Sequence, residues 1–355
     1  MSLDELRKKI DEADDRIVKL IADRIRQAQE IGQEKQKIGM QIEDTAREER
    51  VLTHVREIAR QENLGEKDIE NIYRQIVNLS RSVQGIVVAF QGEIGAYSEE
   101  ACFHFFGPGV QVKPLETLDE VFKAVEQGDV RYGVVPVENS LEGSISRVYD
   151  LLLSSNLKVG GEIELRIMHC LIANPTASLD TIKRVYSHPQ ALGQSQAFLR
   201  YLNAELVSTY DTAGSVKIIK EQNIKDGAAV ASARAAEIYG MKILAREIED
   251  NPNNFTRFFI LAREDSPATG SDKTSIVFSV KHQPGALFAV LEAFADGNIS
   301  LTKIESRPTR QKAWEYNFYL DFEGHRQDAA VKTALRRVEK QALFLKILGS
   351  YPKAA

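Results

Sequence analysis

The sequence predicts a multidomain protein with an all-α N-terminal domain, a two-lobed α/β domain in the middle and a small α+β domain at the end. Three observations support this prediction. All 10 prolines of the 355 residues lie at or after Pro108, so the first part of the chain can be helical throughout. From Ile86 onward, short apolar runs alternate with helical stretches. The segment after residue 272 reads as strand, helix, strand, strand, helix, strand.

The composition excludes several classes of protein. The formal net charge is −5, whereas proteins that bind nucleic acids or anionic membranes are usually basic. The two cysteines, Cys102 and Cys170, give no disulfide framework and no CxxC pair. The N-terminus is charged from its start, and no apolar run approaches the ~20 residues of a membrane span. We therefore expect a cytoplasmic protein that binds no nucleic acid, no membrane and no metal.

The first domain is expected over residues 1–84, as three helices. Apolar residues recur with a period near 3.5 over residues 3–38, which predicts one long helix. A capping-box pattern starts a second helix over residues 45–61, and a third is expected over residues 63–84. At ~54 Å the first helix is longer than any compact domain of this size. We expect it to pack against a second copy of itself.

Positive charges interrupt the apolar seam of that first helix. The heptad pattern places Arg24 in the seam, and Lys35 lies on nearly the same face. A charge in such a seam is costly unless it is paired or faces a bound ligand. Arg7 lies ~25 Å away along the helix axis. It cannot reach the same small ligand within one chain, but in an antiparallel dimer it could reach the site of the partner subunit.

The later helices carry further polar residues on single faces. Asp44, Arg47 and Glu48 share one face of the second helix, and Ser80 and Gln84 share one face of the third. Such a set suits a small dianion whose charge shifts during reaction, with catalysis by conformational restriction and electrostatic stabilisation. The alternative is that the cations are solvated and that Glu48 only completes the capping box.

Taken in order, these motifs resemble the all-helical chorismate mutase family over the whole first domain. The resemblance implies an intertwined dimer with two sites, each of which holds chorismate for a Claisen rearrangement to prephenate. It implies roles in gripping carboxylates, donating to the ether oxygen and holding the substrate hydroxyl. The residues that would share these roles are Arg7, Arg24, Lys35, Asp44, Arg47, Glu48, Ser80 and Gln84.

The second domain is expected over residues 86–264, as layers of helices around mainly parallel strands. Its length suffices for two lobes with a cleft between them. Polar motifs lie where the expected strands end, which is where open α/β sheets bind ligands. They occupy residues 92–98, 136–140, 187–190, 211–213 and 254–258. Each motif alone could be a turn or a helix cap. No GxGxxG, P-loop or serine nucleophile elbow is present.

Together these motifs resemble the prephenate dehydratase family, above all the Asn-x-Thr-Arg-Phe run at 254–258. The resemblance implies a fold like that of periplasmic binding proteins and decarboxylative loss of the C4 hydroxyl of prephenate, with no cofactor. It places Thr256 beside the leaving hydroxyl and leaves the proton donor open. The residues expected to line the cleft are Glu138, Asn139, Ser140, Ser187, Gln194, Thr212, Arg257 and Phe258.

Arg257 allows two interpretations, and Ala96 departs from the family pattern. For Arg257 the alternatives are a contact with a substrate carboxylate and a structural role at the end of the strand that carries Thr256. At Ala96 the sequence departs from the family, which more often has Ser or Thr before the tyrosine.

The third domain is expected over residues 273–352, after a linker at 265–272. Its order of elements suits a ferredoxin-like module. Pro284-Gly-Ala-Leu287 and Glu305-Ser-Arg-Pro308 resemble motifs of the ACT domain that dehydratases of this family carry. The resemblance implies that L-phenylalanine binds between paired modules and inhibits the dehydratase. The residues implied are Gly285, Ala286, Leu287, Glu305, Ser306, Arg307 and Pro308.

The joined prediction is a chorismate mutase–prephenate dehydratase with a phenylalanine-sensing domain, assembled as a homodimer or homotetramer. One alternative is that the dehydratase prefers arogenate, since no residue distinguishes a keto group from an amino group. Another is a non-catalytic aromatic amino-acid sensor. The presence of Thr256, Asn139 and the full cationic set argues against a sensor.

Overall fold

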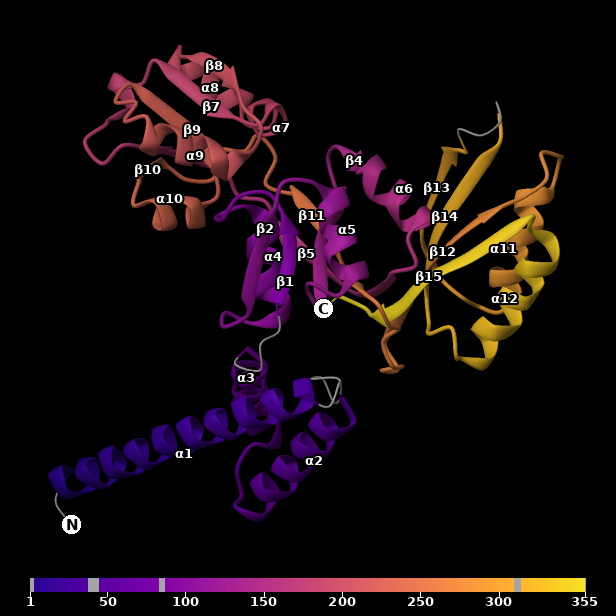
Figure 1. Cartoon of the computed structure of the whole chain (residues 1–355), viewed down its shortest axis with the longest axis horizontal. Helices are drawn as coiled ribbons and strands as arrows, with labels where there is room; N and C mark the ends of the chain where they lie inside the picture. The colour runs from indigo at the N-terminus through magenta and orange to yellow at the C-terminus, as the bar shows by residue number, and fades with distance from the viewer. Residues whose placement is uncertain (1–2, 38–44, 83–86, 310–313, 355) are drawn as a thin grey trace. The chain divides into compact units, whose positions relative to one another are not determined.

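The computed structural model describes residues 3–37, 45–82, 87–309 and 314–354 (Figure 1). The chain forms two compact units, Met1–Val88 with Cys102–Val112 and Ala89–Ala101 with Lys113–Ala355. Within the described residues, no helix combines the length and apolar character that crossing a bilayer requires. Nor does any group of three or more His, Cys, Asp or Glu side chains in these residues form a candidate metal site.

Over residues 3–37 and 45–82 the chain forms three helices, as the sequence predicts. They are α1 (Leu3–Lys37), α2 (Thr45–Gln61) and α3 (Glu66–Ser82). The helices α2 and α3 pack on each other, and α1 contacts α3. The buried apolar residues of this small core include Leu52 and Val55 of α2. The prediction of three helices is therefore confirmed.

Most of the apolar seam of α1 stays exposed in the single chain. Leu6, Ile10, Ile17 and Leu20 expose between 45% and 65% of their surface. A row of exposed apolar residues along a helix is a surface that another element normally covers. The expected second copy of the helix stays a prediction.

The middle domain contains two sheets, which are the two expected lobes. The first sheet has the order β2-β1-β3-β11-β5, with the short strand β4 beside β3. Its strands are β1 (Val87–Gln91), β2 (Gln111–Leu115), β3 (Tyr132–Asn139), β4 (Gly143–Ser144), β5 (Lys158–Arg166) and β11 (Phe255–Ala262). The helices of this lobe are α4 (Tyr97–Phe106), α5 (Leu118–Gln127) and α6 (Ser146–Ser154).

The second sheet has the order β10-β6-β9-β7-β8. Its strands are β6 (Cys170–Ala173), β7 (Arg184–Ser187), β8 (Glu205–Ser208), β9 (Gly227–Ala231) and β10 (Lys242–Ala245). Its helices are η1 (Leu179–Thr181), α7 (Pro189–Gly193), α8 (Gln196–Leu202), α9 (Thr212–Glu221) and α10 (Ala233–Tyr239). Apolar side chains of α9 and α10 form one core of this lobe, and those of α7 and α8 form another. The fully buried strand β9 contributes to both cores, so the lobe is a sheet between two helical layers.

The expectation of mainly parallel sheets is wrong, because both sheets of the middle domain contain antiparallel pairs. The strand β11 lies between β3 and β5 and is antiparallel to both. In the second sheet, β7 is parallel to β8 and β9, but β6 is antiparallel to β9 and β10. The chain leaves the first lobe after β5 and returns as β11, after it has built the second lobe. Residues 167–169 and 246–254 form the two segments that cross between the lobes. On its return the chain inserts β11 antiparallel to β3 and β5.

The C-terminal domain has the predicted order of elements. Its parts are β12 (Asp272–Ser279), α11 (Ala286–Asp296), β13 (Leu301–Pro308), β14 (Tyr316–Glu323), α12 (Ala329–Gln341) and β15 (Phe344–Pro352). The strands form one antiparallel sheet in the order β13-β14-β12-β15. Both helices pack on one face of this sheet, where Phe278, Phe294 and Phe322 are fully buried. The ferredoxin-like expectation is confirmed.

The edge strand β15 of the C-terminal sheet lies against the edge strand β5 of the first lobe. A Cβ atom built on Gly349 would lie 2.1 Å from the carbonyl oxygen of Val159. Lys158 adds a hydrogen bond from its Nζ to the carbonyl oxygen of Ile347, at 3.3 Å. The two backbones approach so closely that only glycine fits at position 349.

We predict that Gly349→Ala lowers the stability of the chain by about 1–3 kcal/mol, because the added methyl group forces the two strands apart. Urea unfolding measures the effect. Gly193→Ala is the matched control, since a Cβ there meets nothing within 4 Å. An unfolding midpoint of Gly349→Ala equal to that of the wild type would show that the strands do not meet at this glycine.

Candidate active sites

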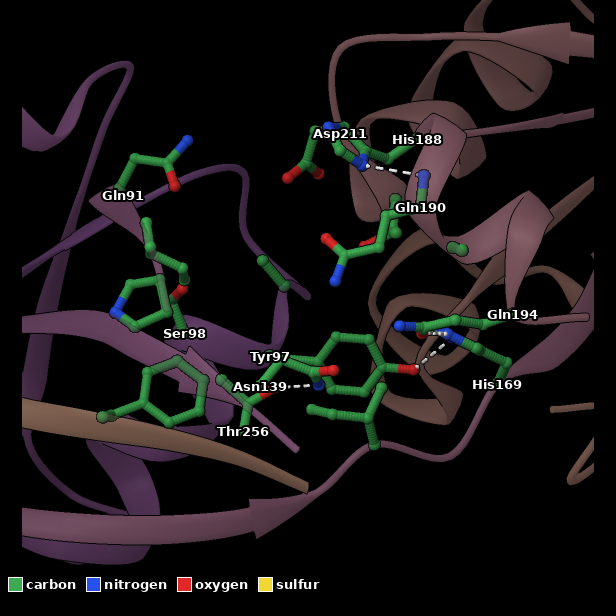
Figure 2. Close-up of a pocket in the computed structure, with 17 residues that line it drawn as sticks. Gln91, Tyr97, Ser98, Asn139, His169, His188, Gln190, Gln194, Asp211 and Thr256 are labelled. Carbon is green, nitrogen blue, oxygen red and sulfur yellow. Dashed lines mark hydrogen bonds between the residues drawn. The ribbon is translucent and has the colours of Figure 1, made fainter. Parts of the chain in front are cut away.

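A pocket lies between the two lobes of the middle domain (Figure 2). The first lobe contributes residues from the ends of β1 and β3, from the starts of α4 and β11, and from the position before α6. The second lobe contributes residues from both ends of α7 and from the start of α9, and the crossings supply Ile167 and His169. The lining residues are Gln91, Ala96, Tyr97, Ser98, Pro136, Asn139, Ile145, Ile167, His169, His188, Gln190, Ala191, Gln194, Asp211, Thr212, Thr256 and Phe258.

Thr256 and Asn139 meet at one wall of this pocket. They are directly opposite each other in the antiparallel pair of β11 and β3. The Nδ2 group of Asn139 donates a hydrogen bond to Oγ1 of Thr256 at 3.0 Å. The Oδ1 atom of Asn139 accepts hydrogen bonds from the backbone N–H groups of Leu141 (3.0 Å) and Glu142 (3.1 Å). The turn after β3 therefore holds Asn139, and Asn139 holds Thr256.

From Asn139 a row of side chains runs through the base of the pocket. Asn139 donates to Oδ1 of Asn254 at 2.8 Å, and Asn254 donates to Oε1 of Gln194 at 2.9 Å. The same Oε1 lies 3.1 Å from Nε2 of His169, whose Nδ1 lies 3.0 Å from the hydroxyl of Tyr97. Burial lowers the pKa of His169, which is 2% exposed, so its ring is neutral.

The opposite wall is the start of α9. Asp211 caps this helix, and its Oδ1 accepts a hydrogen bond from the backbone N–H of Gly214 at 2.8 Å. Burial raises the pKa of the Asp211 carboxyl, and the nearby charge of Glu93 adds to the shift. Thr212 is the first residue of the helix and also lines the pocket. Backbone N–H groups at a helix start favour the binding of carboxylates.

A second group of polar residues lies in the helical part of the chain. Arg24 of α1 donates hydrogen bonds to Oγ of Ser80 and to the carbonyl oxygen of Ile76 (3.4 Å) in α3. Burial lowers the pKa of Arg24, while the electrostatic interactions with Tyr73 and Glu48 oppose the shift. A half-buried cation beside a buried hydroxyl and a carboxylate is an arrangement suited to an anionic ligand.

The structure brings only some of the expected mutase residues together. Arg24, Glu48 and Ser80 lie near one another. Arg7 is exposed and lies 3.6 Å from Asp4, one turn earlier in α1. Arg47 lies in the first turn of α2. Asp44, Gln84 and the side chain of Lys35 lie outside the described residues.

Comparison with known proteins identifies the family to which this chain belongs. Three family models match in order: chorismate mutase type II over residues 6–85, prephenate dehydratase over 88–266 and the ACT domain over 274–340. A bifunctional chorismate mutase/prephenate dehydratase of Stutzerimonas stutzeri is 40% identical over 360 residues, which cover 99% of this chain and 98% of that protein. The chain belongs to the bifunctional chorismate mutase/prephenate dehydratase family.

Two further relatives match the dehydratase and ACT part. An arogenate dehydratase/prephenate dehydratase 2 of Arabidopsis thaliana is 48% identical over 276 residues, which cover 75% of this chain and 72% of that protein. The crystal structure of a prephenate dehydratase from Arthrobacter aurescens in complex with L-Phe superimposes with a TM-score of 0.70. It is 30% identical and covers 76% of this chain and 90% of that one.

Within the dehydratase pocket, the structure separates the expected lining residues into two groups. Asn139, Gln194, Thr212, Thr256 and Phe258 line the pocket. Glu138, Ser140, Ser187 and Arg257 do not.

The four residues outside the lining have other partners. Glu138 pairs with Lys303 at 2.9 Å. Ser140 donates to the carbonyl oxygen of Asn253 at 2.9 Å, which fastens the turn before β11. Ser187 is fully buried and donates to the carbonyl oxygen of Val230 at 2.6 Å. Neighbouring residues of a strand point to opposite faces, so a motif written as consecutive residues cannot all face one cleft.

Arg257 shows this separation most clearly, because it follows Thr256 on β11 and points away from the pocket. Its Nε donates to Glu162 at 2.8 Å, its Nη1 to Asp321 at 2.6 Å, and its Nη2 to the hydroxyl of Tyr351 at 3.1 Å. Burial alone would lower the pKa of Arg257, but the electrostatic interactions with Asp321, Tyr351 and Glu162 outweigh it and raise the pKa. Of the two alternatives for Arg257, the geometry favours the structural one.

The expected effector motif of the ACT domain is also divided between two faces of its strand. Glu305 pairs with Lys303 at 3.2 Å and accepts a hydrogen bond from Ser144 of the dehydratase domain. Arg307 donates to Ser146 at 2.9 Å and lies 3.4 Å from Asp150. The residues between and after them, Ser306 and Pro308, are exposed.

The other half of that motif is the turn before α11. Gly285 caps the helix with a φ of +81°, a conformation that favours glycine. Ala286 and Leu287 begin the helix, and Leu287 packs against the core of the domain.

The pocket also contains residues for which the sequence predicted no role. Tyr97, His188 and Asp211 belong to the expected motifs without an assigned function, and His169 lies in none of them. His169 directly precedes the apolar strand β6. A single histidine before a buried strand has no spacing to a partner, so the sequence carries no signal for it. Its partners Gln194 and Tyr97 are distant in the chain and meet it only in the fold.

We predict that Arg257→Met lowers the stability of the chain by about 3–5 kcal/mol, because it removes the cation paired with the buried Asp321 and leaves Glu162 with Lys273 alone. Urea unfolding measures this, and the KM for the dehydratase substrate should change little. Arg263→Met, at an exposed position just after the same strand, is the control and should be neutral. A large rise in KM at unchanged stability would instead place Arg257 on the substrate.

Proposed function

We propose that the chain converts chorismate to prephenate in its helical domain and prephenate to phenylpyruvate in the pocket of its dehydratase domain. L-Phenylalanine bound to the ACT domain inhibits the second reaction. The observation that carries the proposal is the pocket wall in which Asn139 occupies the acceptor side of Thr256. That contact leaves the hydroxyl hydrogen of Thr256 to donate to a substrate.

The first reaction needs no nucleophile. In the Claisen rearrangement of chorismate, the ether C–O bond breaks while a C–C bond forms, and no atom enters or leaves. Arg24, with Arg7 of the partner subunit, holds the two carboxylates in the reactive conformation. Lys35 and Gln84 donate to the ether oxygen as negative charge develops on it, and Glu48 holds the hydroxyl. Catalysis then comes from conformational restriction and from charge stabilisation.

The remaining helical residues support this set. Arg47 orients the substrate, while Asp44 and Ser80 position the groups that touch it. The contact of Ser80 with Arg24 supports this division.

The second reaction removes two groups from one ring. The bond between C1 and its carboxylate breaks and releases CO2, and the electron pair enters the ring. The C4 hydroxyl leaves with one added proton as water, and the ring becomes aromatic. Thr256 donates a hydrogen bond to the leaving oxygen, which stabilises its departure. Gln194 and the start of α9 at Thr212 bind the carboxylate end of the substrate.

Arogenate is a second candidate substrate for the same pocket. It carries an ammonium group where prephenate carries a keto oxygen, and the carboxyl of Asp211 lines the pocket. A carboxylate would attract the ammonium group. The 48% identical Arabidopsis relative is named for both activities. The ratio of kcat/KM for the two compounds decides between them.

The proposed assembly is at least a homodimer formed through α1. The exposed seam from Leu6 to Leu20 is the surface that a second α1 covers, and a single chain keeps Arg7 remote from Arg24. Pairing of ACT domains would form the phenylalanine sites that Gly285 and Ser306 help to line.

We predict that the purified chain, given chorismate alone, forms prephenate first and phenylpyruvate later, and that L-phenylalanine suppresses only the second product. Thr256→Ala should stop the reaction at prephenate because the leaving hydroxyl loses its donor, whereas Thr256→Ser should retain much of the activity. Product analysis over time measures both. Equal loss of both activities in Thr256→Ala would show that Thr256 is structural, and an inert wild type would refute the proposal.

We also predict that Arg7→Ala and Arg24→Ala each abolish mutase turnover, while their mixture recovers it. A heterodimer of the two variants contains one intact site, so a random mixture should reach about a quarter of the wild-type activity. Mass spectrometry of the mixture verifies subunit exchange. Exchange without recovered activity would contradict a site shared between subunits.

A further inference from the structure

The row of side chains at the base of the dehydratase pocket connects the two lobes twice. Figure 2 shows one of the two connections, from Gln194 through His169 to Tyr97. Asn139 and Tyr97 belong to the first lobe, and Gln194 belongs to the second. Asn254 and His169 lie on the two segments that cross between the lobes. Any change in one member therefore alters how the lobes meet around the substrate.

The direction of each hydrogen bond in this row is determined by its first member. Backbone N–H groups can only donate, so the atom of Asn139 that faces Leu141 and Glu142 is the oxygen Oδ1. The Nδ2 group of Asn139 must then donate, and the atom of Asn254 that receives it is Oδ1. The other end of Asn254 is consequently its Nδ2 group, which donates to Oε1 of Gln194.

The same reasoning defines the tautomer of His169. Oε1 of Gln194 can only accept, so Nε2 of His169 carries a hydrogen and donates to it at 3.1 Å. In a neutral imidazole the other nitrogen, Nδ1, has no hydrogen and accepts. The hydroxyl of Tyr97 lies 3.0 Å from Nδ1 and donates to the carbonyl oxygen of Met168 at 2.8 Å, so these two acceptors share its single hydrogen. Both ring nitrogens thus face protein groups.

This series of hydrogen bonds determines the orientation of the side-chain amide of Gln194. With Oε1 of Gln194 held by both Asn254 and His169, its Nε2 group points the other way. Among the described residues this buried nitrogen has no hydrogen-bond partner, although Gln194 is only 9% exposed. A buried donor without a partner is rare in proteins. An acceptor oxygen of a bound substrate would satisfy it.

We propose that His169 is a positioning residue of the dehydratase reaction. Its Nε2–H group holds Gln194 so that the amide hydrogens point at the substrate. The inference rests on the proposed function of the pocket. It adds a residue that touches the reacting groups only through Gln194.

The test compares His169→Leu with His169→Gln in the full-length chain. The leucine variant removes the donor, so kcat/KM of the dehydratase should fall by up to about 100-fold as Gln194 loses its orientation. The glutamine variant places an amide nitrogen close to the former Nε2 and should recover most of that loss. The mutase rate of the same preparations should match the wild type, and a single cooperative thermal transition verifies that each variant is folded.

A double-mutant cycle separates positioning from a structural role. If His169 acts through Gln194, then His169→Leu should add no further loss to Gln194→Ala, and both single variants should change kcat and KM in the same proportion. Additive losses, or wild-type turnover by His169→Leu, would overturn the inference. So would a His169→Gln variant that is as impaired as His169→Leu while both remain folded. A wild type without dehydratase activity would refute the proposed function first.

Discussion

The buried charges around Arg257 are the constraint on which the joined dehydratase and ACT domains depend. Arg257 and Lys273 supply two positive charges, and Glu162 and Asp321 supply two negative ones. Each domain contributes one cation and one anion, and two of the three ion pairs cross from one domain to the other. Removal of any one member leaves a buried charge without compensation. Since Thr256 is the neighbour of Arg257, the strand that carries the candidate catalytic hydroxyl is held from behind by the ACT sheet.

A second group of ion pairs joins the dehydratase domain to the ACT domain. Lys303 of the ACT strand β13 lies between Glu305, 3.2 Å away, and Glu138, 2.9 Å away. Glu305 belongs to the expected effector motif, and Glu138 precedes the Asn139 that bonds Thr256. One lysine side chain therefore separates the effector motif from the pocket wall. This arrangement arises because successive side chains of a strand point to opposite faces. Alternate residues of β3 and β13 therefore face the domain interface.

Much of this architecture is predictable from local patterns in the sequence. The distribution of proline and the heptad spacing predict α1, α2 and α3, and the order of apolar runs predicts the C-terminal sheet. Thr256, Asn139 and Gln194 line the pocket as expected. Asn139 ends β3, Thr256 lies at the start of β11, and Gln194 ends the short helix that follows β7. The direction of β11 was not predictable, because no local pattern records that a strand inserts after the chain has built another lobe. His169 was missed for a similar reason: its partners are distant in the chain.

The close approach of Gly349 to β5 has a consequence for how such genes can recombine. An ACT domain from another protein would fit this dehydratase only if it brought a glycine at that point of its last strand. It would also need an acid in place of Asp321 and a base in place of Lys273, matched to Arg257 and Glu162. These residues must be inherited together, so the boundary at 265–272 is a poor crossover point even though its composition is that of a linker.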